Sequence, residues 1–295
     1  MLSRYIPNST NYQHRHPDSR GKRNVSGADE ERNQMKVNKV KRLLDQGGVT
    51  MGTMILEFST TGIARIAAEA GSEFAVFDME HTGWNMETIR MLMASSVGTD
   101  IVPMVRVPAL QYHFISRILD VGAMGVVVPF VSNEEQAREI VSCAKYPPEG
   151  RRGVAFGVAH DGYRAGNLVT KMRRANEEIV VIAQIENADG VEHVDQIAAV
   201  HGIDALWIGQ FDLSTSLGIP GRLDHRIFQE ATQKVVEACR RHNKVAVLGA
   251  PDPQSLARGP SDGFRMLVYL TDIWIYQKGL RDCFGVIRSA AERRD

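Results

Sequence analysis

Short runs of apolar, often β-branched residues recur along the chain from Val49 onward, each followed by a polar turn and a segment of helical periodicity. Eight such runs span residues 49–55, 73–79, 100–107, 125–131, 179–186, 204–212, 244–250 and 265–271. Because they lack the polar alternation of a half-exposed strand, they predict strands covered on both faces, as in a parallel sheet. The segments between them, such as 60–71 and 224–244, place their apolar residues on one helix face.

Eight strand–helix units over about 245 residues match a (β/α)8 TIM barrel in number and length. A doubly wound open sheet is the alternative. It is disfavoured because no G-x-G-x-x-G motif follows the first strand, and GGVTMG at 47–52 precedes a strand instead of a helix. We therefore expect a single α/β barrel domain over residues 35–295, in which Gly71 and Gly122 end helices.

Three segments stand outside this regular pattern. Residues 1–34 are polar and interrupted by proline and glycine, which predicts a disordered N-terminal extension. The connection at 146–178 is long for a barrel, and loops of this size are usually functional lids or rims. Residues 280–293 predict a last helix that packs on the barrel or on a neighbouring subunit.

Composition excludes several classes of partner. Basic and acidic residues both number 35, so the zero net charge gives no reason to expect nucleic acid or an anionic membrane. No apolar run approaches the roughly 20 residues of a membrane helix. Cys143, Cys239 and Cys283 show no C-x-x-C spacing, which argues against disulfides and thiolate zinc and favours a reducing compartment, the cytoplasm. Each cysteine is expected to be a small core residue.

Ionisable and amide side chains gather at the ends of four predicted strands. In chain order they are Asp78, Glu80 and His81 after the second strand, Arg106 on the third, Gln184 and Glu186 on the fifth, and Asp212 on the sixth. Chemistry in a (β/α)8 barrel takes place at the carboxyl ends of the strands. Any one of these residues could be a salt-bridged rim residue, but a ring of ionisable groups around one opening is costly without a ligand. This opening is therefore the predicted active site.

The residue types at this opening favour metal-assisted enolate chemistry. Glu186 and Asp212, with no cysteine and few histidines near them, make a hard oxygen site suited to Mg2+ or Mn2+. No lysine ends a strand at this face, so a Schiff-base aldolase is disfavoured. A metal-bound enolate needs a Lewis acid, a cation near the developing oxyanion and a base. The Glu186/Asp212 metal, Arg106 and His81 would supply these three.

Six motifs now follow in an order and spacing that resemble one enzyme family: DMEH (78–81), MVRVP (104–108), LDVGAMGVVVPFV (119–131), YPPEGRRGV (146–154), QIEN (184–187) and WIGQFDLSTSLG (207–218). They resemble the metal-dependent (class II) pyruvate aldolases of the 4-hydroxy-2-oxoheptanedioate and 2-keto-3-deoxyglucarate aldolase family, related to the citrate lyase β-chain. The resemblance covers residues 48–290. It implies a phosphoenolpyruvate/pyruvate-type barrel that reversibly cleaves a 4-hydroxy-2-oxo acid to pyruvate, or a related 2-oxo acid, and an aldehyde.

The resemblance also implies which residues carry the reaction. Glu186 and Asp212 correspond to ligands of a divalent cation, Mg2+, Mn2+ or Co2+. Arg106 corresponds to the arginine that stabilises the enolate oxygen. His81 corresponds to the base, working through water, and Asp120 to the carboxylate that orients it.

Substrate contacts and assembly are implied in the same way. Gln184 and the backbone N–H groups of Phe211 and Asp212 would hold the substrate carboxylate. Asp78 and Glu80 would lie on the aldehyde side or in a supporting shell, and Glu80 could equally brace the arginine. Sites in this family form near subunit contacts and the last helix is exchanged, so we expect a homohexamer built as a trimer of dimers.

Two stretches near the pocket rim depart from the family pattern. Gly209-Gln210-Phe211 stands where many members have Gly-Pro, and Tyr269-Leu270-Thr271-Asp272 replaces a run of small residues. They predict a bulkier, more apolar pocket for the aldehyde. Enzymatic alternatives that use the same groups are oxaloacetate decarboxylation and a macrophomate-synthase-like carbon–carbon bond formation. The alternative outside enzymes is a non-catalytic barrel that serves as a scaffold.

Overall fold

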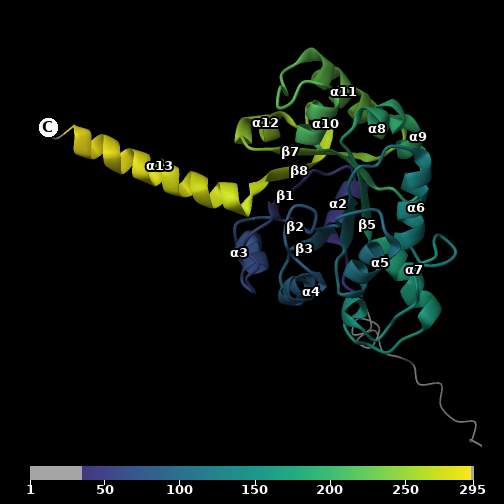
Figure 1. Ribbon diagram of the computed structural model, residues 1–295. Coiled ribbons are helices and arrows are strands. Elements are labelled where there is room, and N and C mark those ends of the chain that lie inside the picture. The colour runs from purple at the N-terminus through teal and green to yellow at the C-terminus, as the bar shows by residue number, and fades with distance from the viewer. Residues whose placement is uncertain (1–34, 294–295) are drawn as a thin grey trace, which may run out of the picture. The chain divides into compact units, whose positions relative to one another are not determined.

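The computed structural model describes residues 35–293, apart from the side chain of Leu270, and these residues form a closed barrel of eight parallel strands (Figure 1). Each strand pairs with the next in chain order, and β8 pairs with β1. The strands are β1 Thr50–Ile55, β2 Phe74–Asp78, β3 Val102–Arg106, β4 Gly125–Val128, β5 Val180–Ile185, β6 Ala205–Ile208, β7 Val245–Ala250 and β8 Phe264–Thr271. The predicted TIM barrel is confirmed.

Helices alternate with the strands. They are α2 Lys39–Asp45, α3 Ile63–Glu69, α4 Met86–Ser95, α5 Tyr112–Asp120, α6 Glu134–Ala144, the 3-10 turn η1 Ala159–Asp161, α7 Leu168–Glu178, α8 Ala188–Glu192, α9 Val194–Ala199, α10 Gln210–Ser216, α11 Arg226–Arg241, α12 Pro253–Arg258 and α13 Asp272–Glu292. Gly71 and Gly122 directly follow the C-cap residues of α3 and α5, with φ of +92° and +112°. Glycine adopts this left-handed conformation most readily, so both predicted helix ends are confirmed.

Apolar side chains fill two layers on either side of the strands. Inside the barrel, strand residues such as Met104 and Trp207 pack with Leu44 of α2, the helix that precedes β1 at the amino end. Outside it, residues such as Val105 and Leu206 pack against the surrounding helices. Because successive strand residues point to opposite faces and both faces are buried, the strand sequences are continuously apolar.

Two elements differ most from their predicted bounds. The sixth strand ends at Ile208 instead of Asp212, and the following residues turn into α10. Leu213 N–H then bonds to the carbonyl of Gly209 at 2.8 Å, which closes a helical turn where a strand was expected. The last helix begins at Asp272, well before Leu280, because Thr271 caps its first turn by accepting the N–H of Trp274. The buried carboxylate of Asp272 accepts the N–H groups that follow β1 and so anchors this start to the barrel.

The remaining expectations have mixed outcomes. The predicted extension at 1–34 lies outside the described residues. Cys143 and Cys239 are buried as expected, whereas Cys283 is exposed on α13, so its prediction as a core residue is wrong for the single chain. Within residues 35–293, no helix combines the length and the apolar character that crossing a membrane requires.

The long connection after α6 runs beside neighbouring helices. Its Gly153 N–H donates to Tyr112 Oη of α5 at 2.7 Å, and its Arg151 guanidinium lies 5.4 Å from the ring of the same tyrosine. A buried ion pair between Asp161 and Lys171, with Nζ 2.5 Å from Oδ2, joins η1 to α7. These contacts anchor the connection to the outer helices.

Candidate active site

Arg106 and Asp78 form a buried ion pair at the carboxyl ends of β3 and β2, where they are direct neighbours in the strand register. Arg106 donates from Nε to Asp78 Oδ1 at 2.7 Å and from Nη2 to Oδ2 at 2.9 Å. This two-point contact fixes the plane of the guanidinium. Asp78 is fully buried and also accepts the N–H groups of Glu80 and His81. It therefore holds Arg106 and the 78–81 turn from behind, and the expectation that Asp78 contacts substrate is not supported by this geometry.

Glu80 links the guanidinium to the histidine of the same turn. Its Oε2 lies 3.1 Å from Arg106 Nη1 and 3.7 Å from His81 Nε2. The Glu80 side chain is buried, whereas His81 is 56% exposed and open to an incoming molecule. Of the two predicted roles for Glu80, the structure places it where it braces Arg106.

Glu186 follows β5 and is buried with two hydrogen bonds. Its Oε1 accepts the N–H of Phe130 at 2.6 Å, and its Oε2 accepts Nε2 of Gln184 at 2.5 Å. Gly209 lies directly against this carboxylate, since a Cβ at Gly209 would stand 2.3 Å from Glu186 Oε2. The space for Glu186 thus depends on the absence of a side chain at Gly209.

Asp212 and Phe211 lie in the first turn of α10, immediately after β6. The N-cap residue Gly209 carries no side chain that could bond to the amides of this turn. First-turn N–H groups have no partner within their own helix, so those of Phe211 and Asp212 are suited to donate hydrogen bonds to a carboxylate of a ligand. Their position agrees with the predicted substrate contact, which stays a prediction.

The carboxylates of this opening influence one another. Burial raises the pKa of Glu186 to about 7, the Phe130 N–H opposes the rise, and the negative charges of Glu80 and Asp212 add to it. Burial also raises the pKa of Glu80 to about 7, against the effect of the Arg106 guanidinium. Burial is the main cause of both shifts and the neighbouring carboxylates add to it, so a cation held between these groups would lower both pKa values.

These residues fit a divalent cation. Glu186 follows β5 and Asp212 lies in the helix that follows β6, and both offer oxygen donors. Gln184 Oε1 is buried without a hydrogen-bond partner. Among residues 35–293, no group of three or more His, Cys, Asp or Glu side chains could hold a metal ion. A cation here would take two carboxylates from the protein and its other ligands from water or substrate, as Mg2+ usually does.

Asp120 lies at the opposite end of the barrel. It ends α5, which runs against the strand direction, and β4 begins five residues later at Gly125. Its Oδ1 accepts Nη2 of Arg152 at 2.6 Å, and that guanidinium lies 4.5 Å from the ring of Tyr146. Asp120 therefore does not contact the His81 of its own chain, so it cannot orient that imidazole within a single chain.

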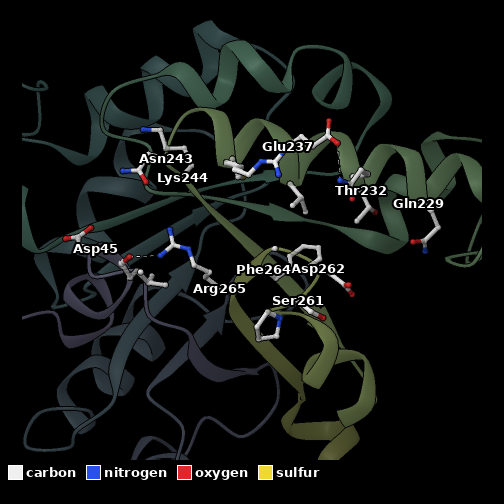
Figure 2. A pocket seen from close by; sticks show the side chains of 18 residues that line it. Asp45, Gln229, Thr232, Glu237, Asn243, Lys244, Ser261, Asp262, Phe264 and Arg265 are labelled. Carbon is white, nitrogen blue, oxygen red and sulfur yellow. Dashed lines mark hydrogen bonds between the residues drawn. The ribbon is translucent and has the colours of Figure 1, made fainter.

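A cavity of about 820 Å3 lies apart from the active-site carboxylates Glu80, Glu186 and Asp212 (Figure 2). Its walls include Asp45 of α2, Glu237 of α11 and Arg265 at the start of β8. Helices α2 and α11 precede strands β1 and β7, and Arg265 lies at the amino end of β8, which places the cavity at the amino end of the barrel. Arg265 donates to the carbonyl of Leu44 at 2.6 Å, so its guanidinium also joins β8 to α2.

Two residues of the site were missed by sequence reasoning. Gly209 makes room for Glu186, and Phe130 supplies the N–H that holds its Oε1. A glycine inside the sixth apolar run, just before its polar end, was a usable signal for the first. Phe130 has a φ of +55°, and nothing in its residue type indicates this left-handed backbone.

Comparison with known proteins agrees with this geometry. Residues 53–253 match the family model described as HpcH/HpaI aldolase/citrate lyase. The hydroxypyruvate/pyruvate aldolase of Roseobacter denitrificans is 32% identical over 80% of this chain and 92% of its own length. The 2-keto-3-deoxy-L-rhamnonate aldolase of Klebsiella pneumoniae is 32% identical over 85% of this chain and 94% of its own. The crystal structure of an HpcH/HpaI aldolase from Desulfitobacterium hafniense superposes with a TM-score of 0.82 at 32% identity, covering 86% of this chain and 97% of the other.

Proposed function

This chain belongs to the HpcH/HpaI aldolase/citrate lyase family and is a carbon–carbon lyase, and we propose that it is a divalent-metal-dependent aldolase. In this proposal it reversibly cleaves a 4-hydroxy-2-oxo acid to pyruvate, or a related 2-oxo acid, and an aldehyde. The observation that carries the proposal is the convergence of Glu186, Asp212 and the Arg106–Asp78–Glu80 group at one opening.

Arg106 is the group proposed to stabilise the enolate. Its guanidinium is held by both oxygens of Asp78 and by Glu80, so it needs little reorganisation when negative charge develops on a substrate oxygen. The cation is proposed as Mg2+, Mn2+ or Co2+, held by Glu186 and Asp212, and when bound it supplies Lewis-acid polarisation of the 2-oxo group. Gln184 and the first-turn amides of α10 would bind the substrate carboxylate.

His81 is the proposed base. Its ring is exposed beside Glu80, which lies between it and Arg106. A histidine in this position can take the proton from the carbon next to the 2-oxo group through a water molecule, and return it in the reverse direction. Because Asp120 does not reach His81 in the same chain, we propose that Asp120 from a second copy orients the imidazole.

A homo-oligomer, expected to be a hexamer, is part of the proposal. Helix α13 (yellow in Figure 1) follows β8 and leaves large apolar side chains exposed along its length, among them Tyr276, Phe284 and Ile287. An amphipathic helix that does not bury its apolar face on its own barrel is stabilised by packing on another chain. The cytoplasm remains the proposed compartment, because the described cysteines are free thiols.

Exchange of the pyruvate methyl protons with deuterated water tests the enolate directly. We expect exchange in protein loaded with Mn2+ or Mg2+, loss of exchange in EDTA, and recovery when the metal is returned. Proton NMR of pyruvate measures the rate without any aldehyde present. Metal-replete protein that shows no exchange would refute the aldolase proposal and favour a scaffold role. Exchange that survives EDTA would refute the proposed dependence on a divalent metal.

A further inference from the structure

Large aromatic side chains stand exposed along the arc of the active-site opening that runs from β4 through β6 to β8, and we call this arc the aromatic side. Phe130 follows β4 and is 49% exposed, Phe211 follows β6 and is 51% exposed, and Trp274 follows β8 and is 41% exposed. All three come after strands, so they lie at the same end of the barrel as the carboxylates. The side of β2 and β3 instead carries the ionic group of Arg106 and Glu80.

Two of these rings form a pair, and the aromatic side is connected to the proposed metal ligands. The rings of Phe211 and Trp274 meet edge to face, with centroids 6.5 Å apart and planes at 84°. Phe211 immediately precedes Asp212 in the first turn of α10. The N–H of Phe130 holds Glu186. The exposed rings therefore border the position where the reaction would take place.

The two sides of the opening suit different parts of the reactants. The 2-oxo acid is small and anionic, and it matches the cation, Arg106 and the α10 amides. The aldehyde joins at a carbon beyond the 2-oxo group, so its substituent must extend outward from the site. Hydroxyl groups on that substituent would lose hydrogen bonds to water against aromatic rings, whereas an apolar substituent would gain from burial there.

We propose that the aldehyde used by this protein carries an apolar substituent, which packs against the Phe211–Trp274 pair; this rests on the proposed aldolase function. In the synthetic direction, pyruvate loses a methyl proton to the base and its C3 forms a bond to the aldehyde carbon. The aldehyde oxygen takes up a proton, so the product is a 4-hydroxy-2-oxo acid with the apolar substituent on C4. Cleavage reverses each step.

A series of straight-chain aldehydes from propanal to hexanal tests this inference in the full-length, Mn2+-loaded protein with pyruvate. These aldehydes differ little in reactivity, so changes in kcat/KM report the contact made by the chain. We expect kcat/KM to rise about twofold to fourfold for each added methylene. In Phe211→Ala and in Trp274→Ala the rise per methylene should shrink toward onefold, whatever the overall rate of each variant.

Tyr163→Asn is the matched control, because it removes an exposed ring from the long connection and asparagine accepts the left-handed backbone at that position. Its rise per methylene should equal that of the unmodified protein. A flat series in the unmodified protein, with pyruvate exchange intact, would overturn the inference and leave the aldolase proposal standing; a second copy that covers the rings would give this result. A rise that persists in both ring variants would also overturn it. Absence of pyruvate exchange would instead overturn the proposed function itself.

Discussion

Replacing Gly209 by alanine is the sharpest single test of how the carboxylate site is built. A Cβ at this position would stand 2.3 Å from Glu186 Oε2, 2.6 Å from Glu186 Cβ and 2.9 Å from Gln184 Nε2. Heavy atoms do not approach so closely, so Glu186 would have to move by about 0.7–1 Å to restore normal contact. The φ of Gly209 is −78°, which alanine adopts freely, so any effect comes from the added methyl group and not from the backbone.

The displacement affects both metal binding and folding. The hydrogen bonds of Glu186 to Phe130 and Gln184, at 2.6 and 2.5 Å, would both be strained. Loss of groups that orient a metal ligand usually reduces metal affinity by about 10-fold to 100-fold, or about 1.4–2.8 kcal/mol. The overpacking itself should reduce the free energy of unfolding by about 1–3 kcal/mol.

Titration calorimetry with Mn2+ measures the affinity, and chemical denaturation in EDTA measures the stability without metal. Gly62→Ala is the matched control, since the nearest atom to its Cβ, Ile66 Cδ1, is 3.8 Å away. We expect its Mn2+ affinity to equal that of the unmodified protein. If Gly209→Ala binds Mn2+ within twofold of the unmodified protein, Glu186 is not the metal ligand that this packing implies.

Three further predictions address other charges. Arg106→Ala should lower the free energy of unfolding by about 3–5 kcal/mol, because Asp78 would remain buried and unpaired. Arg106→Lys should keep more stability yet slow pyruvate exchange about 100-fold. Equal denaturation midpoints for Arg106→Ala and the unmodified protein would contradict this. Burial lowers the pKa of Lys145 from 10.5 to about 8. Between those pH values the unfolded chain binds more protons than the folded one, so the free energy of unfolding should rise with pH, by up to roughly 3 kcal/mol. Chemical denaturation measured from pH 8 to 10.5 should show this rise in the unmodified protein and not in Lys145→Met. Mixing inactive His81→Asn and Asp120→Asn chains after unfolding should restore about a quarter of the exchange rate if sites are shared between copies, and no recovery would refute a shared site.

The position of the site could be predicted from the sequence, but the pairing of its charges could not. The apolar runs predicted the order of the strands and, within a few residues, where each one ends, and the parallel arrangement brings those ends to one opening. The direction of α5 also follows from this alternation, so the distance of Asp120 from His81 was within reach of sequence reasoning. The two hydrogen bonds from Arg106 to the carboxylate oxygens of Asp78 were harder to predict from the sequence, because they depend on the register of β2 against β3.

By itself the sequence determined the barrel, the order of its elements and the end at which the ionisable residues gather, because hydrophobic periodicity is a local property that burial of both strand faces requires. Only the tertiary structure decided that Gly209 makes room for Glu186, that Phe130 holds this carboxylate and that Phe211 meets Trp274. Each of these contacts joins segments far apart in the chain. Whether a methyl group fits, or which donor an oxygen accepts, depends on distances of a few tenths of an ångström that a one-dimensional pattern does not contain.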